Sequence, residues 1–212
     1  ERVLIVDYDA HHGNGTQDTF YDDARVTYVS FHEHPLYPGT GALLETGWGD
    51  GQGRTVNVPV PHGATGDIYR AAVTDVVSPL VDEIGITWLL ISAGFDAHRA
   101  DPLTGLGLTA GDFADITADL VALVPPGRCV AFLEGGYDLD ALRDSTAAAL
   151  GALAGERVHV EAPSGGGPGR DVVAAAHLAH QRALVDDGHA GVRLSGPPTI
   201  RPSFGLAAEG DD

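Results

Sequence analysis

The chain has 212 residues, and its 43% hydrophobic and 20% charged residues are typical of one folded globular domain with a tail. Thirty acidic residues against twelve basic ones, all of them arginine, give a net charge of −18, which disfavours direct binding to nucleic acid. The sequence contains no apolar run of about 18 residues, so we expect no membrane-spanning segment. The single cysteine, Cys129, cannot form an internal disulfide, which fits a cytoplasmic location.

Short apolar runs alternate with stretches of helical spacing over the first 155 residues. The runs are rich in branched and aromatic side chains and predict strands at residues 3–6, 26–31, 56–60, 88–91 and 130–133. Helical spacing covers residues 68–84, 109–124 and 139–153. This alternation predicts an α/β fold with a mainly parallel sheet, in which functional side chains gather at the carboxyl ends of the strands.

The composition changes after about residue 156. Residues 163–169 are rich in glycine and proline and predict a flexible connector, residues 171–187 predict one amphipathic helix, and residues 194–212 are again rich in proline and glycine. We therefore expect a catalytic-type region at 1–155 and a Gly/Pro-rich tail at 156–212 without an obvious core.

Two carboxylates and an imidazole follow the first predicted strand. Asp7, Asp9 and His11 occupy alternate positions, so their side chains project to one side if the chain stays extended. Crowded carboxylates at the end of an apolar strand are costly unless a cation neutralises them, and mixed Asp and His ligation suits zinc or another divalent transition metal. The alternative is that these carboxylates cap a helix or accept hydrogen bonds from a loop.

A second polar cluster follows the strand predicted at 88–91. Asp96, His98 and Asp101 are further candidate metal ligands or groups that orient a ligand. Each of them could instead cap a turn or pair with Arg99.

A third cluster follows the strand predicted at 130–133. Gly135 and Gly136 form a turn that presents the phenol of Tyr137. A tyrosine in this position is a candidate hydrogen-bond donor, and the alternative is a packed ring with a solvated hydroxyl.

Four ordered motifs resemble those of the histone deacetylase and acetylpolyamine amidohydrolase superfamily. They are Asp-Tyr-Asp-Ala-His-His-Gly-Asn-Gly-Thr-Gln at 7–17, Tyr-Pro-Gly-Thr-Gly at 37–41, Ser-Ala-Gly-Phe-Asp with Ala-Asp-Pro-Leu within 92–103, and Glu-Gly-Gly-Tyr at 134–137. The resemblance covers about residues 1–155 and is nearest to the class II-like bacterial members. It implies an arginase-like three-layer α/β fold and the hydrolysis of acetyl amide bonds on lysine or polyamine amines.

Carried over position by position, the resemblance assigns the cations. It makes Asp9, His11 and Asp101 the zinc ligands and leaves Asp96 and His98 outside the first coordination sphere. Three protein ligands leave the open position that a catalytic zinc requires. The resemblance also implies a monovalent cation, commonly potassium, at Asp7, Ser30 and Phe31.

The resemblance further assigns residues that contact the substrate. Tyr137 would donate a hydrogen bond to the carbonyl oxygen of the acyl group as negative charge builds up on it. Tyr37, Gly135 and Gly136 would line the narrow channel for the acyl-lysine side chain.

Members of this superfamily carry a tandem histidine pair upstream of the first zinc-binding strand, where it serves as general base and general acid. The only adjacent histidines here are His11 and His12; His11 is assigned to zinc, and we expect His12 to pack or to form hydrogen bonds. The sequence also lacks methionine. We therefore expect it to be the later portion of a deacetylase domain, truncated on its N-terminal side and with little activity alone.

The sequence thus predicts that the parent protein is a zinc-dependent amide hydrolase. Its substrates would be acetylated lysine peptides or proteins, or acetylpolyamines, and an oligomer is possible. One alternative is a non-catalytic metal-binding fragment or pseudoenzyme, which the missing general base favours. The other is an arginase-type ureohydrolase, which needs two manganese ions and additional Asp-x-Asp ligands that the sequence after Asp96 does not offer.

Overall fold

The computed structural model describes residues 1–186, which build a five-stranded sheet. All neighbouring strands are parallel, in the order β3-β2-β1-β4-β5. The strands are β1 (Val3–Asp7), β2 (Val26–Glu33), β3 (Thr55–Val60), β4 (Trp88–Ala93) and β5 (Cys129–Leu133). The predicted parallel α/β fold is confirmed.

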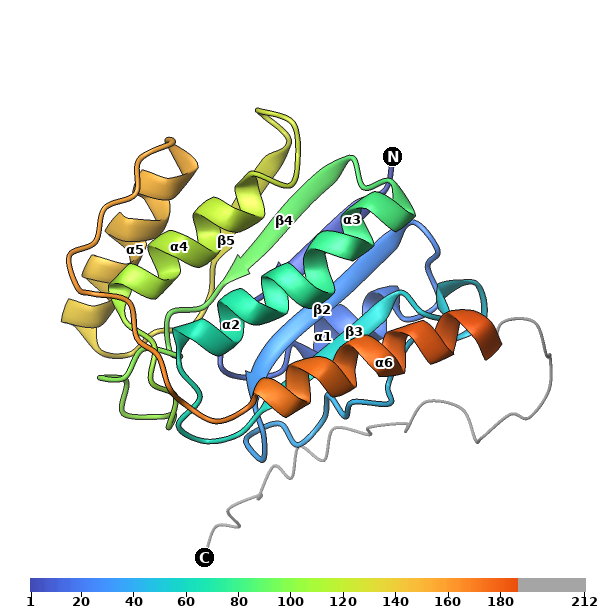
Figure 1. Ribbon diagram of the computed structural model, residues 1–212, viewed down its shortest axis with the longest axis horizontal. Helices are drawn as coiled ribbons and strands as arrows, with labels where there is room; N and C mark the ends of the chain where they lie inside the picture. The colour runs from blue at the N-terminus through green and yellow to red at the C-terminus, as the bar shows by residue number, and fades with distance from the viewer. Residues whose placement is uncertain (187–212) are drawn as a thin grey trace, which may run out of the picture.

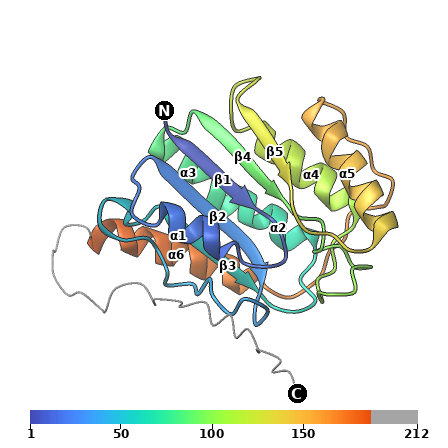
Figure 2. The same cartoon turned by 180° about the vertical axis from the view of Figure 1, so that it is seen from behind.

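Helices lie on both faces of the sheet. Helices α2, α3, α4 and α6 cover one face, as Figure 1 shows, and α1 lies on the other face, as the view from behind in Figure 2 shows. The α-helices are α1 (Asn14–Phe20), α2 (Gly66–Ala72), α3 (Ser78–Ile84), α4 (Ala110–Val121), α5 (Leu139–Leu153) and α6 (Arg170–Asp186). Within residues 1–186, no helix combines the length and the apolar character needed to cross a membrane.

The core follows the alternation of side chains along the strands. Leu4 and Val6 of β1 belong to the main core, whereas Ile5 between them belongs to a smaller cluster with Tyr28 and Phe20. Successive side chains of a strand point to opposite faces, so a continuous apolar run is buried on both sides. This is why β1 lies in the middle of the sheet.

Strand β5 is the edge strand on the side of β4, and its apolar side chains are exposed. The exposed fractions are 41% for Val130, 51% for Phe132 and 61% for Leu133. The edge strand on the other side, β3, is almost completely buried. The two edges of the sheet therefore differ strongly in their contact with solvent.

The helix predicted at 68–84 is interrupted. A five-residue π-helical segment, η2 (Val73–Val77), joins α2 to α3. Helix α4 begins at Ala110, one residue after the predicted start, and its N-cap Thr109 forms a capping box with Asp112. Helix α1 was not predicted from the sequence, because a polar seven-residue helix without a capping side chain carries no apolar period.

The glycine-rich connector at 163–169 is held to the domain by hydrogen bonds. The N–H of Gly66 donates to Ser164 Oγ at 2.9 Å, and the N–H of Gly167 donates to Thr65 Oγ1 at 2.8 Å. The segment is thus bound to the starts of α2 and α4, and its flexibility stays a prediction.

Helix α6 packs against the sheet. Its residues Val173 and Ala176 are 0% and 1% exposed and belong to the main core. This part of the predicted tail therefore adds to the core instead of standing apart from it. The remaining predicted tail, at 187–212, lies outside the described residues, and the division into two regions stays a prediction.

Candidate metal centre

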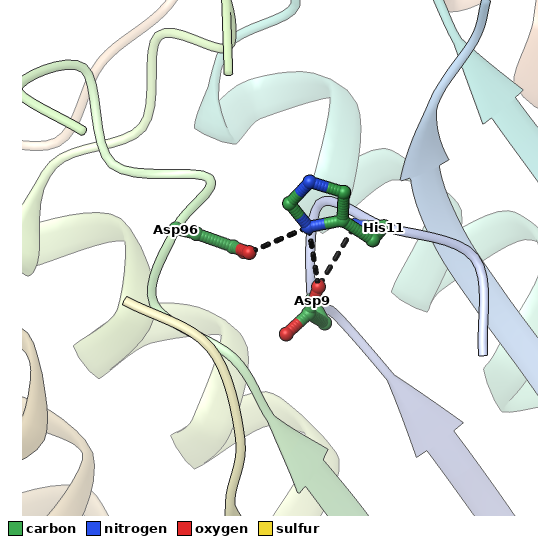
Figure 3. A group of neighbouring side chains, drawn as sticks. All are labelled: Asp9, His11 and Asp96. Atoms are coloured by element: carbon green, nitrogen blue, oxygen red, sulfur yellow. Dashed lines mark hydrogen bonds and ion pairs between the residues drawn. The ribbon is translucent and has the colours of Figure 1, made fainter. Parts of the chain in front are cut away.

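Three side chains that bind metals well meet at the carboxyl ends of β1 and β4. Asp9 and His11 come from the segment after β1, and Asp96 comes from the loop after β4 (Figure 3). One potential ligand atom from each lies within 4.8 Å of the others. Because β1 and β4 are parallel neighbours, with Asp7 opposite Ser92, both chain segments leave the sheet at the same edge.

The imidazole of His11 lies between the two carboxylates. Its Nδ1 is 2.8 Å from Asp96 Oδ2 and 3.2 Å from Asp9 Oδ1. The hydrogen bonds to Asp9 and Asp96 raise the pKa of His11 to about 10. A positive charge at this place, on a protonated His11 or on a bound cation, offsets the charges of the two carboxylates.

The main chain closes tightly around the two carboxylates. The N–H of Ala10 donates to Asp96 Oδ1 at 2.8 Å, and the N–H of Gly135 donates to Asp9 Oδ2 at 3.0 Å. A Cβ at Gly94 would lie 2.0 Å from Asp9 Oδ2, and one at Gly135 would lie 2.5 Å from Asp96 Oδ2. Only glycine therefore fits at these two positions while Asp9 and Asp96 keep their places.

The structure does not bring Asp101 into this group. Its Oδ2 accepts a hydrogen bond from the N–H of Tyr137 at 2.7 Å, and its Oδ1 accepts one from the N–H of Leu103 at 3.0 Å. The structure thus groups Asp96, and not Asp101, with Asp9 and His11, and the choice of zinc ligands stays a prediction. His98 stays outside the group, as predicted, and its Nε2 lies 2.7 Å from a carboxylate oxygen of Glu161.

Tyr137 stands at the glycine turn after β5, next to the three side chains. Burial and the negative charges of Asp96, Asp9 and Asp101 raise the pKa of Tyr137 above its ordinary value. The phenol therefore stays protonated at neutral pH and can donate a hydrogen bond. Tyr137 is 55% exposed.

Residues 1–153 match the Histone deacetylase domain family. The chain belongs to this family. It is 45% identical over 159 residues to a probable deacetylase of Archaeoglobus fulgidus, which covers 73% of this chain and 44% of the relative. It is 43% identical over 159 residues to histone deacetylase 10, chloroplastic, of Oryza sativa subsp. japonica, covering 74% of this chain and 36% of the relative. The chain thus spans less than half the length of these two relatives.

Solved deacetylase structures share the fold. The crystal structure of the HDA15 HD domain superposes with a TM-score of 0.76 at 36% identity, covering 88% of this chain and 53% of that chain. The structure of the histone deacetylase Clr3 gives a TM-score of 0.74 at 37% identity, covering 86% of this chain and 31% of that chain. The predicted resemblance to the histone deacetylases is confirmed.

Another buried carboxylate lies at the end of β1, two residues before Asp9. Asp7 is 2% exposed and accepts a hydrogen bond from the hydroxyl of Tyr28 at 2.9 Å. Burial raises the pKa of Asp7 to about 7, although the Tyr28 hydrogen bond acts to lower it. Ser30 is opposite Asp7 in the β1–β2 register, and Phe31 follows it. The sequence analysis missed Tyr28, although it shares a face of β2 with Ser30 by alternation.

The residues predicted for the substrate channel lie in two loops. Tyr37, in the loop after β2, is 80% exposed. Gly135 contacts the carboxylates as described, and Gly136 has a φ of +137°, which favours glycine. The assignment of all three to a channel stays a prediction.

His12 forms hydrogen bonds inside the domain, as predicted. Its Nδ1 lies 2.7 Å from Thr40 Oγ1, and its Nε2 lies 3.0 Å from Gln17 Oε1. Its side chain is buried, and burial lowers the pKa of His12. With both ring nitrogens engaged, His12 is unsuited to proton transfer with a substrate.

Proposed function

We propose that the protein containing this chain hydrolyses acetyl or similar short acyl amide bonds on lysine side chains or polyamines, with zinc as its metal. The observation that carries this proposal is the group of Asp9, His11 and Asp96 beside the turn that presents Tyr137, whose residue Gly135 donates to Asp9. Family membership supports the same reaction class. The full activity is proposed for the whole protein, because the chain spans only part of its relatives.

The residues present fit a divalent zinc ion. Zinc in catalytic sites takes three nitrogen, oxygen or sulfur ligands from the protein and keeps one position open, and two carboxylates with one imidazole provide such a set. Because residues 94 and 135 are glycines, the main chain lies close against the carboxylates of Asp9 and Asp96. We propose that Asp9, His11 and Asp96 hold the ion. When bound there, zinc would polarise the acyl carbonyl and activate a water molecule.

Tyr137 supplies the second electrophilic group. Its hydroxyl is protonated at neutral pH, as for any tyrosine whose pKa is not lowered, and it donates to the acyl oxygen. This hydrogen bond strengthens as negative charge develops on that oxygen, so it stabilises the transition state more than the bound substrate.

We propose a monovalent cation, potassium, at Asp7, Ser30 and Phe31. A carboxylate that is 2% exposed is costly to ionise without a positive partner, and the pKa of Asp7, raised by burial to about 7, reflects this cost. A cation bound there would favour the charged form of Asp7. Asp7 is two residues from Asp9, so the cation would also steady the strand end that carries a zinc ligand.

We propose that Tyr37, Gly135 and Gly136 line the path of the acylated side chain. The glycine at 135 lets the main chain pass close to the carboxylates, and the exposed aromatic ring of Tyr37 suits the methylene chain of lysine or a polyamine. The negative net charge of −18 also favours cationic substrates of this kind.

The test combines metal content and hydrolysis. We expect about one zinc ion per chain in the wild-type protein, lost in Asp9→Ala and Asp96→Ala and kept in the exposed control Asp18→Ala. The wild-type protein should release acetate from an acetyl-lysine peptide or from an acetylpolyamine, and a chelator should abolish this release. Bound zinc without hydrolysis of either substrate would favour the non-catalytic alternative.

A further inference from the structure

Asp101 is a buried carboxylate that the metal group does not use. It is 6% exposed, and its two oxygens each accept one main-chain hydrogen bond. The bond to Leu103 lies within its own loop, after β4. The bond to the N–H of Tyr137, at 2.7 Å, crosses to the turn after β5, 36 residues away in the sequence.

The turn that carries Tyr137 is fixed at two other points. The N–H of Phe95 donates to the carbonyl oxygen of Gly135 at 2.7 Å, and the N–H of Gly135 donates to Asp9 at 3.0 Å. Both contacts hold residue 135, two residues before the tyrosine. Gly136, between Gly135 and Tyr137, has a φ of +137° and no side chain that could anchor the turn.

The ring of Tyr137 gives little further restraint. It is 55% exposed, and within residues 1–186 no hydrogen bond involves its hydroxyl. The direction of the ring therefore depends on the main chain at residue 137. In this part of the structure, that main chain is held by the carboxylate of Asp101.

We propose that Asp101 is a positioning residue, which fixes the main chain of Tyr137 so that the hydroxyl points at the acyl oxygen. A hydrogen bond to a buried carboxylate is shorter and stronger than one between neutral groups, so it is suited to this task. Displacements of about 1 Å in a catalytic group can cost about 10²-fold in rate. The catalytic part of this inference rests on the proposed deacetylase function, whereas the structural part does not.

The structural part is tested by amide hydrogen exchange measured by NMR. In the wild-type protein the amide of Tyr137 should exchange slowly despite the exposed ring. In Asp101→Ala it should exchange about tenfold faster or more, because the acceptor is lost, and in Asp101→Asn it should exchange faster by a smaller factor, because only a neutral acceptor remains. The amide of Gly135, which Asp9 holds, should keep its rate and serve as the internal reference. Asp140→Asn, an exposed carboxylate on α5 that pairs with Arg143, is the control variant.

Metal content and kinetics complete the test. Asp101→Asn should retain about one zinc ion per chain, whereas Asp96→Asn should lose it. Asp101→Asn should lower kcat about tenfold with KM changed by less than about twofold. In the Tyr137→Phe background the same substitution should have almost no further effect, because Asp101 acts through that hydroxyl.

The possible outcomes are distinct. Loss of zinc in Asp101→Asn would make Asp101 a ligand and overturn the inference. Fast exchange of the Tyr137 amide in the wild-type protein would also overturn it, and this measurement does not depend on the variants folding. A zinc-loaded wild-type protein that hydrolyses no acyl amide would contradict the proposed function, while the exchange and metal measurements would still decide the role of Asp101.

Discussion

At the scale of single residues, the candidate metal group of Asp9, His11 and Asp96 depends on the absence of neighbouring side chains as much as on these three residues. A Cβ at Gly94 would meet the carboxylate of Asp9 at 2.0 Å, so the loop after β4 can approach β1 only with glycine there. By contrast, a Cβ at Gly15 in α1 would meet nothing within 4 Å. The two positions therefore allow a matched comparison.

We expect Gly94→Ala to lose zinc and to lower the free energy of unfolding by about 1–3 kcal/mol, the usual cost of an overpacked interior. Gly15→Ala should keep zinc and raise the unfolding free energy by up to about 1 kcal/mol, because alanine favours a helix more than glycine does. Zinc content and urea unfolding measure both effects. Full zinc occupancy in Gly94→Ala would show that Asp9 can move without losing the metal.

We expect Tyr137→Phe to lower kcat by about 10²–10³ with a much smaller change in KM, because the hydroxyl acts mainly as charge develops in the transition state. The phenyl ring preserves the packing, so zinc content should not change. Steady-state hydrolysis of an acetyl-lysine peptide measures the effect. Unchanged turnover would show that Tyr137 only lines the site and that its hydroxyl plays no part in catalysis.

Sequence reasoning found Asp9, His11 and Tyr137 because strand ends and alternation place them where they are. The resemblance assigned Asp101 to the metal, whereas the structure places Asp96 beside Asp9 and His11. Both carboxylates lie in one loop, and spacing alone does not tell which of them turns inward. The structure separates them by their partners: Asp96 accepts from Ala10 beside β1, and Asp101 accepts from Tyr137. Such a choice depends on contacts between distant segments, which one sequence does not display.

At the scale of elements, the segment between α5 and α6 forms hydrogen bonds with the loop after β4 and with the start of α4. The carboxylate of Glu161 accepts hydrogen bonds from the N–H of Ala110 at 3.0 Å and from Arg99 at 2.5 Å, and it lies 2.7 Å from His98. Burial acts to raise the pKa of Glu161, but these donors outweigh it and lower the pKa to about 2. One side chain thus links the loop after β4 to the start of α4.

This lowered pKa predicts a pH dependence of stability. Since the folded-state pKa of Glu161 lies below its ordinary value of 4.5, its contribution is fully present above about pH 4.5 and is lost as the pH falls toward 2. We expect Glu161→Gln to lower the unfolding free energy by about 2 kcal/mol at pH 7. The difference from the wild type should shrink between about pH 4.5 and 3.

Urea unfolding at several pH values measures this difference. Glu156→Gln, an exposed carboxylate in the same segment, should leave the stability unchanged at every pH. A gap between the wild type and Glu161→Gln that stays constant down to pH 3 would contradict the assigned role of the charge.

Strands were easier to predict than the shorter helices and the final segment. Continuous branched and apolar runs indicate buried parallel strands almost directly, and all five were placed within two residues at each end. Helix α1 has only Gln17 buried and no capping side chain, so its place comes from tertiary contacts. The packing of α6 likewise depends on small apolar residues, such as Ala176, which carry little signal in a sequence.

At the scale of the whole molecule, two surface properties oppose each other. The edge strand β5 exposes Val130, Phe132 and Leu133, and a long apolar edge strand favours pairing with another chain. The net charge of −18 keeps chains apart through mutual repulsion. Salt weakens the repulsion and leaves the apolar attraction in place.

We expect the 212-residue chain to self-associate more strongly as the salt concentration rises from about 10 mM to about 500 mM, because the Debye length falls from about 30 Å to a few Å. The double variant Val130→Thr/Phe132→Thr should reduce this association. Leu178→Thr, an exposed leucine on α6, is the control and should not. Sedimentation velocity measures the effect, and association that weakens with salt would point to ion pairs instead of the apolar edge.

The central position of β1 also determines when the ligand group can form during folding. Its partners in the sheet are β2, about 20 residues away, and β4, 85 residues away in the register of Val3 with Trp88. Long-range parallel pairing is slow, because the chain loses the entropy of closing a large loop before stabilising contacts form. Asp9 and His11 therefore come together with Asp96 only after β1 and β4 have paired. A metal ion added to refolding chains should bind with the kinetics of this late pairing, after the α4–α5 pair has formed from its local contacts.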